Sequence, residues 1–106
     1  MWLRLSVVLL AAFPFGAMAQ IVNPWPSLPR DLPKEIRAFM ERRAECNFWA
    51  GELTPNDADR NAEADANMVA LRCGTLGRDE AALNQRYGSN PAYLKIIGVS
   101  ASWLPR

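Results

Sequence analysis

The stretch Glu45–Gly74 decides the fold: it opens with Glu45-Cys46-Asn47-Phe48-Trp49-Ala50-Gly51-Glu52 and closes with Leu71-Arg72-Cys73-Gly74. These two ends carry the only two cysteines of the chain. The spacing between Cys46 and Cys73 matches neither the short motif of redox enzymes nor a zinc knuckle. A chain of this size has a thin core, which a covalent bridge supplements in an oxidising compartment. The sequence therefore predicts a disulfide bond between Cys46 and Cys73.

A first helix is predicted from about Asp31 to Gly51. Asp31 is suited to cap the free backbone N–H groups, Pro33 to occupy the first turn, and Gly51 to take a left-handed conformation after the last turn. The side chains expected to face inward recur at helical spacing: Ile36, Phe39, Met40, Arg43, Cys46 and Asn47. The residues expected outside this stripe are Glu41, Arg42 and Glu45.

A second helix is predicted between the two cysteines. Thr54 is its expected cap, Pro55 its first residue and Gly74 the residue that stops it. The expected apolar face comprises Ala58, Ala62, Ala66, Val69, Ala70 and Cys73. The residues expected to lie largely outside that face are Asp59, Arg60, Glu63 and Arg72.

The disulfide bond conflicts with a tight hairpin of these two helices. A straight helix from Pro55 would place Cys73 roughly 27 Å from the turn, whereas bridged Cα atoms lie within about 7 Å of each other. Either residues 47–57 run back extended alongside the second helix, or that helix begins later, around Asp59 to Asn61. We expect the connection to take a long route that crosses the helix.

Two shorter helices are predicted in the last third of the chain. The first spans 78–87, with Leu76, Leu83 and Tyr87 facing inward. Asn90-Pro91 then opens a helix over 91–97.

The last of these helices is expected to pack Tyr93 or Leu94 with Ile97. The tail 99–106 is expected either to be loose or to dock Trp103. No strand pattern of useful length appears, so the predicted fold is all-α, a small bundle of four short helices with one disulfide.

The N-terminal part predicts an exported protein. Residues 1–19 have the features of a secretory signal peptide cleaved before Gln20: Arg4, an apolar run, and small residues at its end. The apolar run is too short to cross a membrane as a helix. Residues 20–33 form a proline-rich lead-in, for which a flexible leader is favoured over a recognition motif. A further alternative is that Trp25 folds back over the core. The helical domain is expected to span 34–98.

The net charge of the chain after signal cleavage limits the classes of partner. Without Arg4, the remaining Lys and Arg balance the 11 Asp and Glu. A chain without a basic surplus has no electrostatic attraction to nucleic acid or anionic lipid. We therefore expect a protein partner, no binding to nucleic acid and no insertion into a membrane after signal cleavage. The signal peptide predicts a periplasmic or secreted location.

No cofactor or metal site is predicted. The sequence contains no histidine, which removes the usual base of a catalytic triad and the commonest zinc ligand. Asp57-x-Asp59-x-Asn61 has the beginning of a calcium loop. However, Ala62 stands where that loop needs glycine, and Met68 where it needs glutamate.

Glu45 and Glu52 are candidates for the paired carboxylates of a small hydrolase. Hydrolysis of a glycosidic bond requires two carboxylates about 5 to 9.5 Å apart across a cleft. Their spacing on one helix separates them by about 10.5 Å along the axis, and a chain this small has little volume for such a cleft. The prediction is a protein that is not an enzyme, with a hydrolase as the third alternative.

An aromatic and acidic cluster is the predicted partner-binding surface. Phe48 and Trp49 lie near Glu45, Glu52 and Asp57 at a helix end. Aromatic residues of this kind dominate many protein interfaces. A position in the core is the alternative for both aromatic residues, and it is favoured for Phe48.

The whole pattern resembles small periplasmic immunity proteins of the Tai type. The resemblance covers about residues 46–97 and rests on Cys46 with the aromatic pair and Gly51, Cys73, Leu83-x-x-x-Tyr87 and Asn90-Pro91. The proline-rich lead-in and the charged second helix depart from the family's pattern, and no inhibitory loop carries over by residue.

That family is all-helical and disulfide-bonded, and it neutralises cell-wall amidase toxins delivered by type VI secretion. The resemblance implies a binding protein, with immunity or inhibition of a periplasmic hydrolase as the leading form. The alternative is a periplasmic chaperone or envelope accessory protein with broad client binding.

Overall fold

The computed structural model describes residues 23–106, so the predicted signal peptide lies outside the described residues. The described chain contains the helices α1 (Lys34–Gly51), α2 (Ala58–Ala70), α3 (Leu76–Arg86) and α4 (Pro91–Val99). It also contains the short 3-10 turns η1 (Trp25–Ser27), η2 (Cys73–Thr75) and η3 (Ser100–Ser102). No strand occurs between residues 23 and 106. The predicted all-α bundle of four helices is confirmed.

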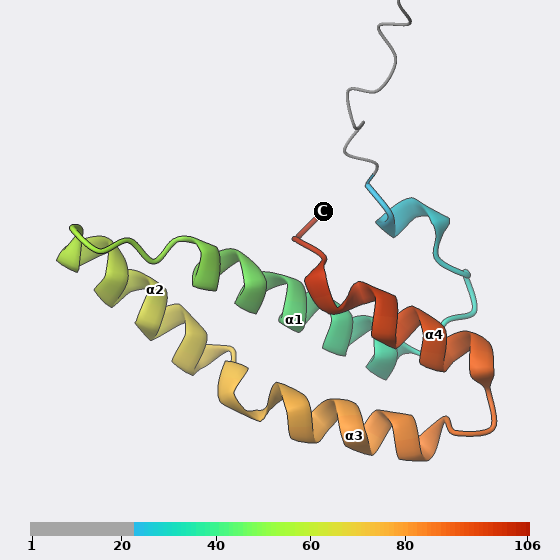
Figure 1. The fold of residues 1–106 in the computed structure, drawn as a ribbon. Helices are drawn as coiled ribbons and strands as arrows, with labels where there is room; N and C mark the ends of the chain where they lie inside the picture. Colours follow the sequence, from blue (N-terminus) through green and yellow to red (C-terminus); the bar gives the residue numbers. More distant parts are fainter. Residues whose placement is uncertain (1–22) are drawn as a thin grey trace, which may run out of the picture.

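Helix α1 lies at the centre of the arrangement (Figure 1). The helices α2 and α3 follow one another in the direction opposite to α1, and α4 returns across α1. The turn η3 packs against α1 and brings the tail of the chain beside it. Helix α1 is therefore the element against which α2, α3, η2 and η3 pack.

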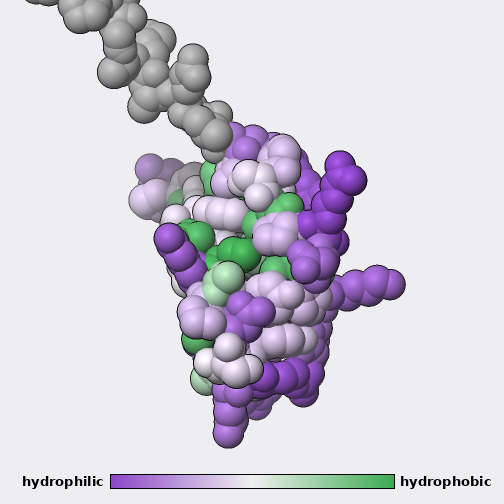
Figure 2. Space-filling model, turned by 90° about the vertical axis from the view of Figure 1, so that its right-hand side faces the viewer, coloured by the Kyte–Doolittle hydropathy of each residue, from purple (hydrophilic) through white to green (hydrophobic). Residues whose placement is uncertain are grey.

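The core forms along the predicted inward stripe of α1. Ile36, Met40 and Ala44 are fully buried or nearly so, and Ile97 of α4 is completely buried against the same cluster. Phe39, Arg43 and Cys46 are also buried, as their helical spacing predicts. Figure 2 views the molecule from the side where α3 ends and α4 begins; hydrophobic residues there form a patch within a hydrophilic rim.

The proline-rich lead-in is part of this core, so the prediction of a flexible leader is wrong from residue 23 onward. Trp25 is only 5% exposed, and its ring packs edge-to-face on Trp103 at 5.2 Å. Its indole Nε1 donates a hydrogen bond of 2.8 Å to the backbone oxygen of Leu104. Leu32 is buried as well. The lead-in and the tail therefore hold each other on the surface of α1, and Trp103 docks.

The disulfide bond forms as predicted, but within a hairpin whose connection does not cross α2. The Cα atoms of Cys46 and Cys73 lie 5.7 Å apart. Helix α1 continues to Gly51, and residues 52–57 extend in the same direction before α2 turns back (Figure 1). The segment from Cys46 to residue 57 therefore covers about the same distance as α2, about 20 Å. This equal length brings Cys46 and Cys73 side by side.

Residues 47–51 continue helix α1 and do not run back extended, so the first of the two alternatives is wrong. Helix α2 begins at Ala58, later than Pro55, which is close to the second alternative. Asp57 is the observed cap, and its carboxylate accepts a hydrogen bond from the backbone N–H of Arg60. Thr54, the predicted cap, instead exchanges two hydrogen bonds with Asn61, of 2.9 and 2.6 Å.

The predicted apolar face of α2 is wrong. Its helical members Ala58, Ala62, Ala66, Val69 and Ala70 are all exposed, and Ala64 is the buried residue of this helix. Polar contacts and the disulfide determine how α2 is rotated, because Arg60 and Asn61 are tied to the connection before it. Burial of the alanine stripe would require a neighbour on the outer side of the hairpin.

The predicted helix ends need three corrections. Pro33 rather than Asp31 precedes α1, and no side chain caps it. No described glycine has a positive φ, so neither Gly51 nor Gly74 acts as a left-handed stop. Arg72 takes that conformation instead, at φ 54° and ψ 46°, and α2 ends before Cys73.

The two C-terminal helices lie close to where the sequence predicted them, with α3 over Leu76–Arg86 and α4 over Pro91–Val99. Leu83 is buried, and Tyr87 packs against the core. The Asn90 side chain caps α4 by accepting from the backbone N–H of Tyr93. Ile97 is fully buried, with Tyr93 packed against the same cluster.

Candidate protein-binding surface

The aromatic pair predicted from the sequence lies at the surface on the last turns of α1. The rings of Phe48 and Trp49 pack edge-to-face at 5.1 Å. Phe48 is 38% exposed, and Trp49 is half-buried. The core interpretation that the sequence favoured for Phe48 is therefore wrong. The core of this part of α1 is filled by Ala44 and Cys46, which leaves no inward position for Phe48.

A shallow groove of about 650 Å³ runs along this pair, and we call it the aromatic groove. Its lining comprises Glu45, Phe48, Trp49, Asn67, Leu104, Pro105 and Arg106. Helix α1 supplies the floor, α2 contributes one residue, and the tail forms a wall. The contribution of the tail was missed from the sequence; its apolar composition was the only sign of it.

A cluster of charged side chains packs against the Trp49 ring. The guanidinium of Arg60 lies 5.1 Å from the Trp49 ring and forms ion pairs with Glu52 at 2.7 Å and Glu63 at 2.8 Å. The hydrogen bonds that Arg60 donates to these two carboxylates raise its pKa. Glu52 is therefore neutralised within the protein, where it fixes the cation on the indole ring.

The five predicted site residues divide into three groups. Glu45, Phe48 and Trp49 line the aromatic groove together. The Glu52 carboxylate is connected to the Trp49 ring through Arg60. Asp57 caps α2 and does not line the groove. Glu45 is exposed and forms no ion pair with another described residue, so its charge is available to a partner.

The alternative of a hydrolase with Glu45 and Glu52 as paired carboxylates gains no support from this geometry. Glu52 does not line the groove that Glu45 lines, and its carboxylate is held by Arg60. Among residues 23–106, no three Asp, Glu, Cys or His side chains lie together in a way that could hold a metal ion.

A second groove, of about 420 Å³, lies between α1 and α3, and we call it the arginine groove. It is lined by Glu35, Ala38, Phe39, Arg42, Arg72, Asp79, Ala82, Leu83 and Arg86. Arg42 and Arg72 were expected outside the predicted apolar faces, and neither was assigned a role. The predicted Cys46–Cys73 bridge implies that Arg72 lies near α1, but nothing in the sequence indicated the ion pair between Arg42 and Asp79 of α3.

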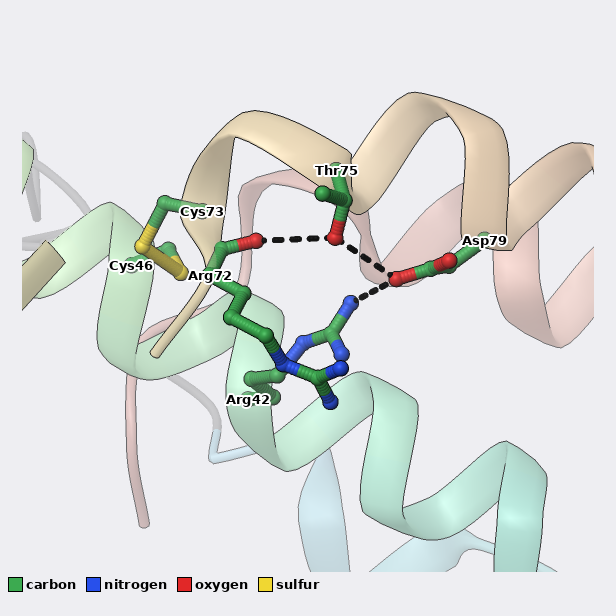
Figure 3. The surroundings of a disulfide bond; sticks show 6 residues. All are labelled: Arg42, Cys46, Arg72, Cys73, Thr75 and Asp79. Carbon is green, nitrogen blue, oxygen red and sulfur yellow. Dashed lines mark hydrogen bonds and ion pairs between the residues drawn. A yellow bond between two sulfur atoms is a disulfide. The ribbon is translucent and has the colours of Figure 1, made fainter. Parts of the chain in front are cut away.

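Ion pairs define the two ends of the arginine groove. At one end, Asp79 binds Arg42 at 2.5 Å and the Thr75 hydroxyl at 2.9 Å (Figure 3). These contacts lower the pKa of Asp79. At the other end, Arg86 binds Glu35 at 2.5 Å.

The pKa of Glu35, at the second end of the arginine groove, is also shifted by the neighbouring Tyr87. The Tyr87 hydroxyl, followed by Arg86, lowers the pKa of Glu35. Glu35 in turn raises the pKa of Tyr87. Both acidic residues of the arginine groove are thus stabilised in their ionised form.

Comparison with known proteins yields no match to a family model, to a curated sequence or to a solved structure. The resemblance to Tai-type immunity proteins therefore rests on the residues quoted for it. None of the helices within residues 23–106 has the length and apolar character that spanning a membrane requires. The Cys46–Cys73 disulfide is typical of proteins from oxidising compartments.

Proposed function

We propose that this protein is an exported protein-binding domain whose partner docks in the aromatic groove. The observation that carries the proposal is the exposed ring of Phe48 and the half-buried ring of Trp49, which line a groove beside Leu104 and Pro105 of the tail. Small proteins bury their large apolar side chains wherever the fold allows it, so two accessible aromatic rings in one groove are typical of an interface.

The lining indicates the chemistry of the partner. Trp49 is already fixed by Phe48 on one side and Arg60 on the other, so little conformational entropy is lost when it is covered. Glu45 adds a carboxylate at the edge of the apolar surface. A partner segment with an apolar side chain next to a lysine or arginine fits this combination.

Immunity or inhibition of a periplasmic cell-wall hydrolase is the leading form of this function. Two features support it: the resemblance of residues 46–97 to Tai-type immunity proteins, and the all-helical, disulfide-bonded fold that the resemblance implies. In this proposal the groove covers a surface of the hydrolase, and the protein itself performs no chemistry.

Capture followed by a binding measurement tests the proposal. The oxidised protein, prepared by export of the full chain, is used as bait in a periplasmic extract, and the retained protein is purified and titrated against it. Trp49→Ala is expected to weaken binding at least about tenfold, as is typical of a central interface aromatic. The matched control is Val69→Ala, which removes an exposed apolar side chain outside the groove.

Two results would contradict the proposal. Equal affinity of the wild-type protein and a correctly folded Trp49→Ala variant would remove the aromatic groove as the binding surface. Retention of many unrelated, partly unfolded proteins would instead support the chaperone alternative. Circular dichroism of both variants checks that the fold is intact.

A further inference from the structure

The arginine groove carries an unbalanced positive charge at the end nearest the disulfide. Arg42 and Arg72 both line this end, together with the single carboxylate of Asp79. Asp79 is already occupied by Arg42 and Thr75. The side chain of Arg72 extends toward the α1 side, in the direction of Arg42 (Figure 3). Its guanidinium forms no ion pair with any described carboxylate.

Arg72 is held in this place by a strained backbone. Its φ of 54° lies in the left-handed region, which costs an L-residue other than glycine roughly 1 to 2 kcal/mol. Cys73, the next residue, is fixed to α1 by the disulfide, so the direction of the Arg72 side chain is restricted. Glycine would satisfy the turn without strain. The presence of arginine at a strained position points to a role for its side chain.

Unpartnered polar atoms occur at both ends of the same groove. The Nε of Arg42 is buried without a hydrogen-bond partner, and so is the Oε1 of Glu35 at the opposite end. Buried polar atoms without partners are uncommon in folded proteins and call for an explanation. Between them lies an apolar floor that includes Phe39 and Leu83. The groove thus offers donors at one end, an acceptor at the other and an apolar surface between.

We propose that the arginine groove binds an acidic peptide segment of a partner protein, with a carboxylate of that segment held by Arg42 and Arg72. Guanidinium groups bind carboxylates strongly through paired, charge-assisted hydrogen bonds. A peptide also supplies an N–H for Glu35 and an apolar side chain for the floor, which inorganic phosphate does not. This inference rests on the proposed function only in that the partner is a protein; it does not need the aromatic groove.

The test uses the full chain in oxidised form and a pair of capped peptides. The peptide Gly-Leu-Glu-Leu-Gly is titrated into ¹⁵N-labelled protein, and the Nε–H signals of Arg42 and Arg72 are followed by NMR. Its neutral counterpart, Gly-Leu-Gln-Leu-Gly, isolates the contribution of the carboxylate. We expect saturable shifts of both arginine signals, and binding at least about fivefold weaker for the neutral peptide.

Arg72→Gly is the decisive variant because it removes the side chain and relieves the backbone strain. It is expected to bind the acidic peptide at least about tenfold more weakly, while its Tm is unchanged or higher. Arg30→Ala is the matched control: it removes the same charge from an exposed position before α1 that lies outside the groove and forms no ion pair with a described carboxylate, and it is expected to leave binding within about twofold.

Several outcomes would overturn the inference. These are undiminished binding by Arg72→Gly, equal binding of the two peptides, or inorganic phosphate that binds as tightly as the acidic peptide at the same arginines. Trp49→Ala separates this inference from the proposed function. Peptide binding that survives in Trp49→Ala supports the arginine groove even where capture through the aromatic groove fails, whereas its loss would place the peptide on the aromatic groove.

Discussion

At the scale of single residues, a buried arginine ties the helices together. Arg43 is only 5% exposed; its Nη2 donates to the Ser100 hydroxyl at 2.5 Å and to the backbone oxygen of Ile97. Its Nη1 lies 3.2 Å from the carboxylate of Glu80. One side chain of α1 therefore reaches α3, the end of α4 and η3. A buried cation is stable only where such partners surround it.

Replacement of Arg43 by alanine should therefore destabilise the protein. Arg43→Ala removes the cation that joins Glu80, Ile97 and Ser100, leaves the last two only their hydrogen bond to each other, and opens a cavity. We expect the free energy of unfolding to fall by about 2 to 4 kcal/mol. Urea denaturation measures this change. Arg37→Ala is the control, because Arg37 makes one exposed hydrogen bond to Pro29; equal loss in the two variants would contradict the role of Arg43.

Acid sensitivity is also a residue-scale property. The pKa values of Glu35 and Asp79 lie below their ordinary values of 4.5 and 3.8. A carboxyl group whose pKa is lowered by folding stabilises the protein above its unfolded pKa, and this contribution is lost as the pH falls through the folded pKa. We expect Tm to fall on acidification from about pH 5 to pH 3.

The double variant Glu35→Gln, Asp79→Asn tests this assignment. Its Tm should be lower than that of the wild-type protein at pH 7, and the further fall toward pH 3 should be smaller. Asp65→Asn is the control, because Asp65 is exposed. Parallel Tm curves for the double variant and the wild-type protein would show that other carboxylates cause the acid sensitivity.

At the scale of elements, α2 is the helix that depends least on the core. Ala64 is its buried residue, and its other attachments are the polar contacts to residues 52–54 and the disulfide just beyond its end. The helix α1, in contrast, contributes Ile36, Met40 and Ala44 to the core. Local stability follows apolar burial, so the hairpin is expected to open before the rest of the bundle.

Removal of the disulfide should release this helix selectively. For Cys46→Ala, Cys73→Ala we expect a loss of about 2 to 4 kcal/mol in the free energy of unfolding, close to the cost of closing the loop between the two residues. Hydrogen exchange should accelerate more in α2 than in α1 or α4. A uniform acceleration in all four helices would show that the disulfide instead stabilises the fold as one cooperative unit.

At the scale of the whole molecule, the two ends of the described chain close the fold. Trp25 and Leu104 are 79 positions apart and share a hydrogen bond, while Trp25 and Trp103 pack ring against ring. The guanidinium of Arg106 lies 5.2 Å from the Trp25 ring and also pairs with Glu41 of α1. The tail that forms a wall of the aromatic groove is thus held by the lead-in.

Trp25→Ala should therefore affect stability and the groove together. Loss of a buried tryptophan costs about 3 to 5 kcal/mol, whereas the half-buried Trp49 should cost less than about 1.5 kcal/mol when it is replaced by alanine. Chemical denaturation compares the two variants. Similar stabilities of Trp25→Ala and the wild-type protein would mean that the lead-in is not needed for the fold.

The features that local sequence determined are those with local physical causes. Helical spacing predicted the inward stripe of α1, and Asn90-Pro91 predicted the start of α4, because caps and periodic apolar residues act within a few positions of the chain. The two cysteines predicted their own bridge. Phe48 and Trp49 were identified as a pair, although their exposure was not settled by pattern alone.

Tertiary structure decided what local pattern could not. The apolar pattern of α2 suggested the alanine stripe, but ion pairs and the bridge hold that stripe toward solvent. Trp25, expected on a flexible leader, is buried because a partner far along the chain covers it. Arg72 meets the groove of Arg42 only because the disulfide brings the end of α2 to α1. Contacts between distant segments depend on the packing of the whole chain, and no local signal encodes them.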